Sequence, residues 1–177
     1  MKKSEGVVMR EKSTKLSLSC AAFLFLCMLA CVVCVASAKT IYVPDDYERI
    51  RWAVDNASAG DTIVVRDGIY VENIDISKPH LTIKSENGST NCIISSAKSD
   101  NVFEITANYV KILGFTIKNA SYPFSGILLR NSDYCNISSN VLLNNWYGIR
   151  LKTSNNTILS NNILNSNNFG IYLSFSN

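Results

Sequence analysis

Short apolar alternations separated by polar residues dominate the second half of the chain. The segment Gly126–Leu129 recurs as Gly148–Leu151 and again as Gly170–Leu173, each time 22 positions further on (148 − 126 and 170 − 148). Within each copy, the isoleucine and the final leucine lie two positions apart. An alternation of two predicts a short strand with these two side chains on one face. The pattern therefore predicts a repeat fold.

A unit of about 22 residues is too short for a strand, a helix and a return strand, which together need about 30 residues. Three short strands and three corners fit it well. The corners are rich in Asn, Ser and Gly, and Asn and Gly tolerate left-handed backbone angles. We therefore expect an all-β fold, a right-handed single-stranded parallel β-helix with about 22 residues per coil. A leucine-rich repeat, the alternative solenoid, needs a more regular leucine pattern.

Stacked coils place equivalent residues about 4.7–4.9 Å apart. The repeat then predicts two interior columns and a stacked pair of corner amides. The first column contains Ile127, Ile149 and Ile171, the second contains Leu129, Leu151 and Leu173, and the amide pair is Asn140 with Asn162.

A different pattern precedes the repeats. Asp45–Glu48 is typical of a helix N-terminus, apolar residues follow at helical spacing from Ile50, and Gly60 closes the segment. We expect residues 39–61 to form an N-terminal cap with an amphipathic helix. The first strand is expected at Thr62–Val65, and coils are expected over residues 62–177. The chain stops partway through a coil, so we expect a piece of a longer product, or self-association at an uncapped end.

The N-terminal region has the organisation of a secretory signal peptide. Basic residues precede an apolar run over Leu16–Val35, and the small residues Ala36-Ser37-Ala38 follow. We expect residues 1–38 to be removed after Ala38 and the protein to be extracellular, on the cell surface or periplasmic. An uncleaved membrane anchor is the alternative, because an apolar run of about 20 residues just spans a bilayer.

The N-terminal region also accounts for the net charge. It contains five basic and two acidic residues of the 17 and 14 in the chain, which leaves 12 of each (17 − 5 and 14 − 2). A neutral mature chain argues against a nucleic-acid partner. Four of the six cysteines lie in the apolar run, and only Cys92 and Cys135 remain. Stacked two coils apart, these two would be too distant for a disulfide, so we expect two buried free thiols.

The segments Thr40–Tyr47, Ala59–Val65 and Gly68–Ile74 resemble the entry to NosD-like β-helix proteins. Leu113–Ile117 resembles the repeats of archaeal surface proteins of this type. The wider group is the carbohydrate-binding and sugar-hydrolysis superfamily of pectate lyase-like folds. The resemblance covers about residues 40–177 and implies the fold. It leaves activity open, because this scaffold hosts many functions.

The NosD family is named for a periplasmic copper-binding protein, so the resemblance implies copper. Copper prefers Cys, Met and His ligands. All three Met lie in the N-terminal region, and the rest of the chain offers one histidine, His80, with two cysteines. A hydrolase needs two acids about 5–9.5 Å apart, yet the coils after residue 105 contain only Asp133. The other acids gather near the predicted cap. We therefore expect no metal, no cofactor and no catalytic set, although catalytic coils beyond residue 177 would make the chain part of a polysaccharide-active enzyme.

A binding surface is better supported. Arg130 and Lys152 share one repeat position, and Arg150 and Tyr172 share the neighbouring outward position. With Trp146, these five residues are the candidate carbohydrate-binding set, and basic groups beside aromatic rings suit an acidic glycan. Tyr147 and Phe169 are expected to pack at a corner or inside. Candidate N-glycosylation sites are Asn56, Asn87, Asn119, Asn136 and Asn155.

Three functions follow in order of preference. The first is an exported, non-catalytic β-helix that binds a polysaccharide or cell-surface glycan or builds a surface layer. The second is a fragment of a polysaccharide lyase or hydrolase. The third is periplasmic copper binding. A membrane partner is expected only through an uncleaved N-terminal segment.

Overall fold

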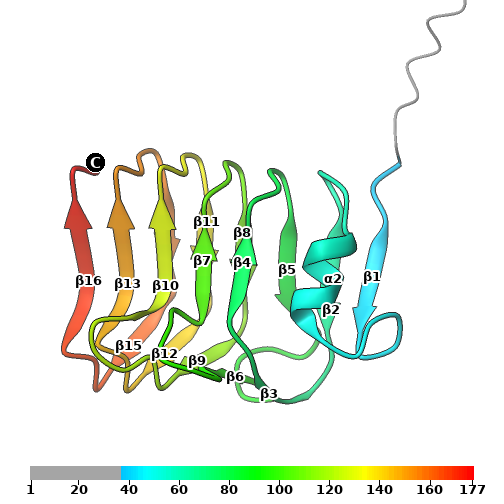
Figure 1. Ribbon diagram of the computed structural model, residues 1–177, viewed down its shortest axis with the longest axis horizontal. Coiled ribbons are helices and arrows are strands. Elements are labelled where there is room, and N and C mark those ends of the chain that lie inside the picture. Colours follow the sequence, from blue (N-terminus) through cyan, green and yellow to red (C-terminus); the bar gives the residue numbers. More distant parts are fainter. Residues whose placement is uncertain (1–36) are drawn as a thin grey trace, which may run out of the picture. The chain divides into compact units, whose positions relative to one another are not determined.

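The computed structural model describes residues 37–177, which form a right-handed parallel β-helix of three sheets (Figure 1). Sheet A contains β1 (Thr40–Val43), β2 (Thr62–Val65), β5 (Thr82–Ser85), β8 (Lys111–Leu113), β11 (Asn136–Ser138) and β14 (Ile158–Ser160). Sheet B contains β3 (Gly68–Val71), β6 (Cys92–Ser95), β9 (Thr116–Lys118), β12 (Val141–Leu143) and β15 (Ile163–Asn165). Sheet C contains β4 (Ile74–Ile76), β7 (Phe103–Ile105), β10 (Ser125–Arg130), β13 (Tyr147–Lys152) and β16 (Phe169–Ser174).

The predicted interior columns are confirmed by the strand register. Ile127 pairs with Ile149 and Ile149 with Ile171, and the leucines two positions later pair in the same way. Ile127 and Ile149 are fully buried. Each coil thus places the same apolar side chains over those of the coil before it, which produces one continuous core along the axis.

Coil length is less regular than the repeat suggests. Along sheet A, Thr62 pairs with Thr82, Thr82 with Lys111, and Lys111 with Asn136, so the successive steps are 20, 29 and 25 positions (82 − 62, 111 − 82 and 136 − 111). The step is 22 positions between Thr40 and Thr62 and again between Asn136 and Ile158. The strands remain in register, so the extra residues are accommodated at the corners.

The repeat glycines are required by close packing. Among the glycines of residues 37–177, only Gly60, Gly68, Gly88 and Gly114 have positive φ, so left-handed geometry does not explain Gly126 or Gly148. A Cβ on Gly148 would lie 2.6 Å from the Gly170 carbonyl oxygen and 2.8 Å from Leu164 Cδ2. The left-handed corners are formed instead by other residues, among them Asn119, Asn131, Asn144, Asn156 and Asn161.

The predicted asparagine pair is confirmed as part of a buried hydrogen-bond ladder. The Asn140 side chain accepts from the Phe115 amide and donates to the Ile112 carbonyl and to Asn162 Oδ1. Asn145 makes the same three kinds of contact one corner later. Each amide therefore satisfies backbone groups that a tight corner would leave unpaired inside the coil.

The N-terminal segment differs from its prediction by one additional strand. β1 pairs in parallel with β2, so the first strand is Thr40–Val43 and Thr62–Val65 is the second. Between them, α2 (Ile50–Asn56) packs against β1, β2 and β4 and takes the position that β4 occupies in the next coil (Figure 1). Residues 39–61 thus contain a strand as well as the helix.

The helix termini also differ from the predicted caps. No side chain at the N-cap residue, Arg49, makes a capping hydrogen bond. The Glu72 carboxylate, just before β4, accepts from the Ile50 and Arg51 amides at 3.1 Å each. At the other end, Lys78 Nζ donates to two helix carbonyls and to that of the C-cap residue Ala57, at 2.8 Å. Both caps come from the next coil, so local sequence spacing could not reveal them.

The two remaining cysteines are free and buried, as expected. The stacking argument behind that expectation was wrong, because Cys92 lies in β6 of sheet B whereas Cys135 precedes β11 of sheet A. Burial raises the pKa of Cys92 to about 12 and also raises that of Cys135. Both thiols therefore remain protonated near neutral pH.

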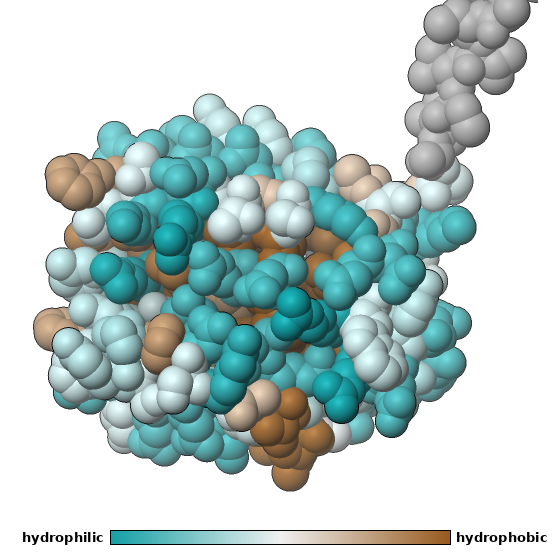
Figure 2. Space-filling view, in the orientation of Figure 1, coloured by the Kyte–Doolittle hydropathy of each residue, from teal (hydrophilic) through white to brown (hydrophobic). Residues whose placement is uncertain are grey.

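Polar side chains cover most of the face seen in Figure 2, with a brown apolar patch at the lower edge over β3 and β6. Ile69 and Val71 on β3 are 71% and 59% exposed. In the last coil, Ile171 and Leu173 are also exposed; the expected self-association there stays a prediction.

No helix among the described residues is long and apolar enough to cross a membrane. The predicted signal peptide lies almost wholly outside those residues.

Candidate functional site

Five aromatic side chains form a continuous cluster at the start of β13 and β16, here called the aromatic strip. Its members are Tyr122, Trp146, Tyr147, Phe169 and Tyr172. Tyr122 comes from the long corner before β10, Trp146 from the corner before β13, and the others from the two strands. Strand pairing places Tyr147 directly beside Phe169, which explains how two residues far apart in the sequence meet.

Each ring of the strip contacts the next ring along it. Tyr122 meets Trp146 edge to face at 4.8 Å between ring centroids. Trp146 meets Phe169 at 6.0 Å, Phe169 stacks on Tyr147 at 5.2 Å, and Tyr147 meets Tyr172 at 5.1 Å. Such edge and offset contacts are the favourable geometries for aromatic pairs. The strip is therefore a packed platform on the outside of the coils.

Much of this platform is accessible to solvent. Tyr122 is 70% exposed, Phe169 44% and Tyr172 37%, while Trp146 and Tyr147 are half-buried. Tyr147 and Phe169 each begin a strand directly after a corner, and Phe169 is partly exposed there. Both residues belong to the same outer surface as Trp146 and Tyr172.

Arg150 lies against this platform. Its guanidinium carbon is 4.8 Å from the Tyr147 ring centroid and 5.5 Å from that of Tyr172, within the range of cation–π attraction. Within residues 37–177, no acidic side chain forms an ion pair with Arg150. Its Nε is buried without a hydrogen-bond partner in the same region. The Arg150 guanidinium therefore lies against two rings without an acidic partner among residues 37–177.

The other two predicted cations lie in register but differ in their environment. Arg130 pairs with Lys152 across β10 and β13. Arg130 Nη2 lies 3.2 Å from Glu104 Oε1, so its charge is already compensated. Lys152 is exposed. Of the three predicted cations, Arg150 is therefore the one that contacts aromatic rings without an acidic partner among the described residues.

A polar hollow adjoins the tryptophan. A cavity of about 290 Å³ lies between the corner that precedes β10 and the two corners that follow β12 and β15. Its lining combines the Tyr122 and Trp146 rings with the polar residues Ser121, Asn144, Asn145, Ser166 and Asn168. Aromatic faces beside amides and hydroxyls suit a ligand with an apolar ring face and many hydroxyl groups.

A second aromatic stack was not anticipated. His80, Tyr109 and Tyr134 occupy one corner in three successive coils, with ring centroids 4.7 Å and 5.1 Å apart and nearly parallel planes. All three have left-handed backbone angles. They are separated by 29 and 25 positions (109 − 80 and 134 − 109), so a search at the repeat spacing of the later coils misses them. Tyr122 was missed for the same reason.

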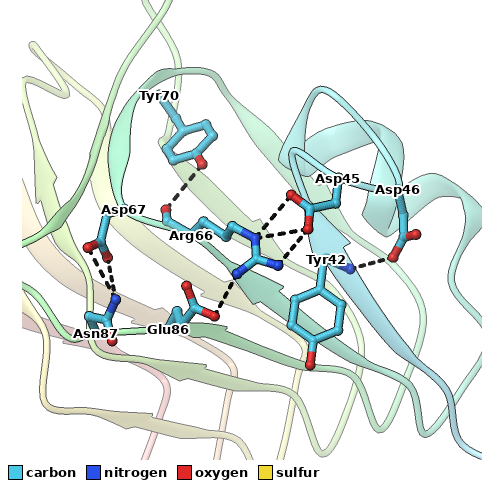
Figure 3. A network of polar contacts seen from close by, with 8 residues as sticks. All are labelled: Tyr42, Asp45, Asp46, Arg66, Asp67, Tyr70, Glu86 and Asn87. Carbon is cyan, nitrogen blue, oxygen red and sulfur yellow. Dashed lines mark hydrogen bonds and ion pairs between the residues drawn. The ribbon is translucent and has the colours of Figure 1, made fainter.

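The acids near the cap form hydrogen-bonded pairs (Figure 3). Arg66 bonds the Asp45 carboxylate through Nε at 3.0 Å and the Glu86 carboxylate through Nη1 at 2.9 Å. The adjacent Asp67 accepts from the Asn87 amide. The hydrogen bonds from Arg66 lower the pKa of Asp45. A general acid needs a raised pKa, so Asp45 is poorly suited to that role.

The five sequon asparagines differ in how free their side chains are. Asn56 donates to the Trp52 carbonyl, Asn87 donates to Asp67, and Asn155 accepts from the Asn177 amide. Asn136 has a buried Oδ1 without a partner among the described residues. Asn119 is exposed at a left-handed corner, and its side chain makes no hydrogen bond within residues 37–177.

Residues 54–177 match the model of a family described as periplasmic copper-binding protein (NosD). The chain belongs to this family. No curated protein matches it significantly. The match covers well over half of the chain and all strands from β2 to β16.

Two solved structures share the fold. One is a pectin methylesterase mutant in complex with a hexasaccharide, with 16% identity and a TM-score of 0.51, covering 67% of this chain and 48% of that one. The other is pectin methylesterase PemA from Erwinia chrysanthemi, with 14% identity and a TM-score of 0.50, covering 73% and 53%. This chain spans about half the length of these structures. Identities this low show the fold alone.

The described residues do not fit a copper centre. Residues 37–177 contain no group of three or more His, Cys, Asp or Glu side chains that could hold a metal. Cys92 lies in β6 whereas Cys135 precedes β11 of another sheet, and burial raises the pKa of both thiols, which opposes the thiolate form that metals bind. His80 uses its ring to stack on Tyr109. Copper bound by this protein would therefore need ligands from outside the described part of the chain.

Proposed function

We propose that this NosD-family chain is an exported, non-catalytic β-helix protein that binds an acidic polysaccharide along the aromatic strip. The observation that carries the proposal is Arg150, which lies against Tyr147 and Tyr172 without an acidic partner in the described region. Export is supported by the organisation of residues 1–38 and by the periplasmic description of the family.

The strip offers the two contacts that an acidic sugar requires. The apolar face of a pyranose ring can stack on the Trp146 or Tyr122 ring, while its hydroxyls meet the amides and hydroxyls of the adjoining cavity. A uronate carboxylate can accept paired hydrogen bonds from Arg150. Lys152, two positions further along the strand, adds a second positive charge for a neighbouring sugar unit. That one of the similar folds was solved with a hexasaccharide bound agrees with a carbohydrate ligand.

A glycan array probed with the exported protein tests the proposal. We expect binding to oligouronates and weaker binding to neutral oligosaccharides of the same length. Trp146→Ala should reduce affinity for both about tenfold or more, equivalent to about 1.4 kcal/mol. Arg150→Gln should reduce only the affinity for the acidic ligands, measured by calorimetry.

Trp52→Ala is the matched control. Trp52 is the other tryptophan, is 45% exposed, and lies on α2 away from the strip. Its replacement should leave glycan affinity unchanged. Equal losses from Trp52→Ala and Trp146→Ala, or no binding to any oligouronate, would contradict the proposal.

The family description favours copper binding as a second candidate. Since the described residues lack a suitable ligand group, copper would need ligands from elsewhere. A copper titration of the full chain, followed by calorimetry, separates the two functions. Tight binding of one copper ion per chain would support this second candidate.

A further inference from the structure

Asp61 lies at the start of the first complete coil and holds the entry of the chain in place. Its side chain is almost fully buried, with 3% of the residue exposed. Oδ1 accepts from the Lys39 backbone nitrogen at 2.8 Å, and Oδ2 accepts from the Ser58 amide at 2.8 Å. The Lys39 carbonyl in turn accepts from the Thr62 amide at 2.8 Å. Lys39 is therefore fastened to the coil through both of its backbone polar groups.

Asp61 binds the backbone nitrogen of Lys39, which would become the new N-terminus if the predicted signal peptide were removed after Ala38. Hydrolysis of the Ala38–Lys39 peptide bond consumes one water, leaves a carboxylate on Ala38 and leaves a free amine, protonated at neutral pH, on Lys39. We propose that Asp61 is the binding site for this new α-ammonium group, so that removal of the leader converts a neutral hydrogen bond into an ion pair. The inference rests on the proposed export.

The surroundings suit a cationic terminus. A hydrogen bond from a charged donor to a carboxylate is about twice as strong as a neutral one. The hydrogen bonds from the Lys39 and Ser58 backbone nitrogens lower the pKa of Asp61, which keeps it ionised. A cavity of about 430 Å³ beside Lys39 is lined by Asp46, Tyr47 and Asn56, among others, and leaves space for the remaining ammonium hydrogens and their water.

Three charged groups besides Asp61 act on this terminus. Asp46 on the cavity lining attracts it. The Lys39 side chain and Lys78 carry positive charge near Asp61 and oppose it. Lys78 Nζ, however, is already hydrogen-bonded to carbonyls at the end of α2, and does not compete directly for the carboxylate. We therefore expect a net gain when the terminus becomes charged.

The consequence is that processing stabilises the first coil. β1 is an edge strand that pairs with β2 alone, so its attachment depends on few contacts. An ion pair at the residue before this strand tightens that attachment only after the leader has left. The fold would then be most stable in the exported form of the protein.

Two forms of the protein test this. One begins at Lys39 and the other retains Ser37 and Ala38; residues 38–177 form a compact unit by themselves. At pH 6, the form beginning at Lys39 should have a melting temperature higher by about 4 °C. The ion pair raises the pKa of the α-amino group above its usual value of about 8, so the difference should be complete below about pH 8 and disappear as the pH rises through the raised pKa.

Asp61→Asn in both forms is the control, because it should abolish the difference between them even if it lowers both melting temperatures. An NMR titration of the Lys39 α-amino group in the unmodified sequence gives a second measure that does not depend on a variant. Equal melting temperatures at pH 6, a difference that survives Asp61→Asn, or an α-amino pKa at or below about 8 would overturn the proposal.

Mass analysis of the exported chain separates this inference from the proposed function. An N-terminus at Lys39 supports it, and an N-terminus elsewhere overturns it. Failure to bind any glycan would sink the carbohydrate proposal and leave the role of Asp61 intact.

Discussion

Gly126 and Gly148 leave no room for a side chain between neighbouring coils. Their φ angles are ordinary, so many residues could adopt the backbone conformation. The space is what excludes a side chain, since a Cβ on Gly148 would approach the Gly170 carbonyl oxygen to 2.6 Å. A backbone atom cannot rotate away as a flexible side chain can, and coil spacing is fixed by the strand hydrogen bonds. Glycine is therefore required at these two positions because the stacked coils leave no space for a Cβ atom.

Gly148→Ala should therefore destabilise the protein by about 1–3 kcal/mol through overpacking. Gly170→Ala provides a matched control in the same repeat position, because its nearest contact would be Leu164 Cβ at an ordinary 3.9 Å. We expect a change within about 0.5 kcal/mol there. Urea unfolding monitored by tryptophan fluorescence measures both; similar losses for the two variants would contradict the packing explanation.

At the scale of single elements, side chains of one coil satisfy the backbone hydrogen-bonding groups of a neighbouring coil. The amides at the start of α2 are capped by Glu72, which enters from the next coil, and its last carbonyls accept from Lys78. The asparagine corners act in the same way, since Asn140 bonds backbone groups of the preceding coil. A seven-residue helix has little stability of its own. Its persistence here depends on contacts from the coil that follows.

Glu72→Ala should lower the free energy of unfolding by about 1–2 kcal/mol, as loss of an N-terminal cap does, and should speed hydrogen exchange of the Ile50 and Arg51 amides. Glu48→Ala is the control. Glu48 lies in the segment from which the sequence predicts the cap, is exposed, and makes no side-chain hydrogen bond among the described residues. If Glu48→Ala proved the more damaging of the two, the helix would be capped locally after all.

At the scale of the whole molecule, the first coils are joined by carboxylates that must remain ionised. Asp45 bonds Arg66, and Asp61 bonds the backbone at Lys39 and Ser58; these contacts lower the pKa of both acids. A lowered pKa in the folded state means that the unfolded chain binds protons first as the pH falls. The stability from these groups is therefore present above about pH 4 and is lost as the pH falls through the lowered values.

We expect the urea concentration at the unfolding midpoint to decrease as the pH is lowered from about 4 to about 2. This dependence should weaken in the double variant Asp45→Asn, Asp61→Asn. Asp55→Asn, which removes an exposed acid of α2 without touching either contact, should leave the pH profile unchanged. An unaltered acid profile in the double variant would show that other groups control acid unfolding.

The sequence by itself determined the β-helix, the interior isoleucine and leucine columns and the asparagine corner, because strand alternation and a constant repeat step are properties of consecutive residues. It also identified Trp146, Tyr172 and Arg150 as outward-facing candidates. Tertiary structure decided what each of them contacts. Tyr122 joins the strip through a corner outside the repeat spacing, and Arg130 is compensated by Glu104 while Arg150 is not. Such contacts depend on coil lengths that vary along the chain, and only folding brings those coils into register.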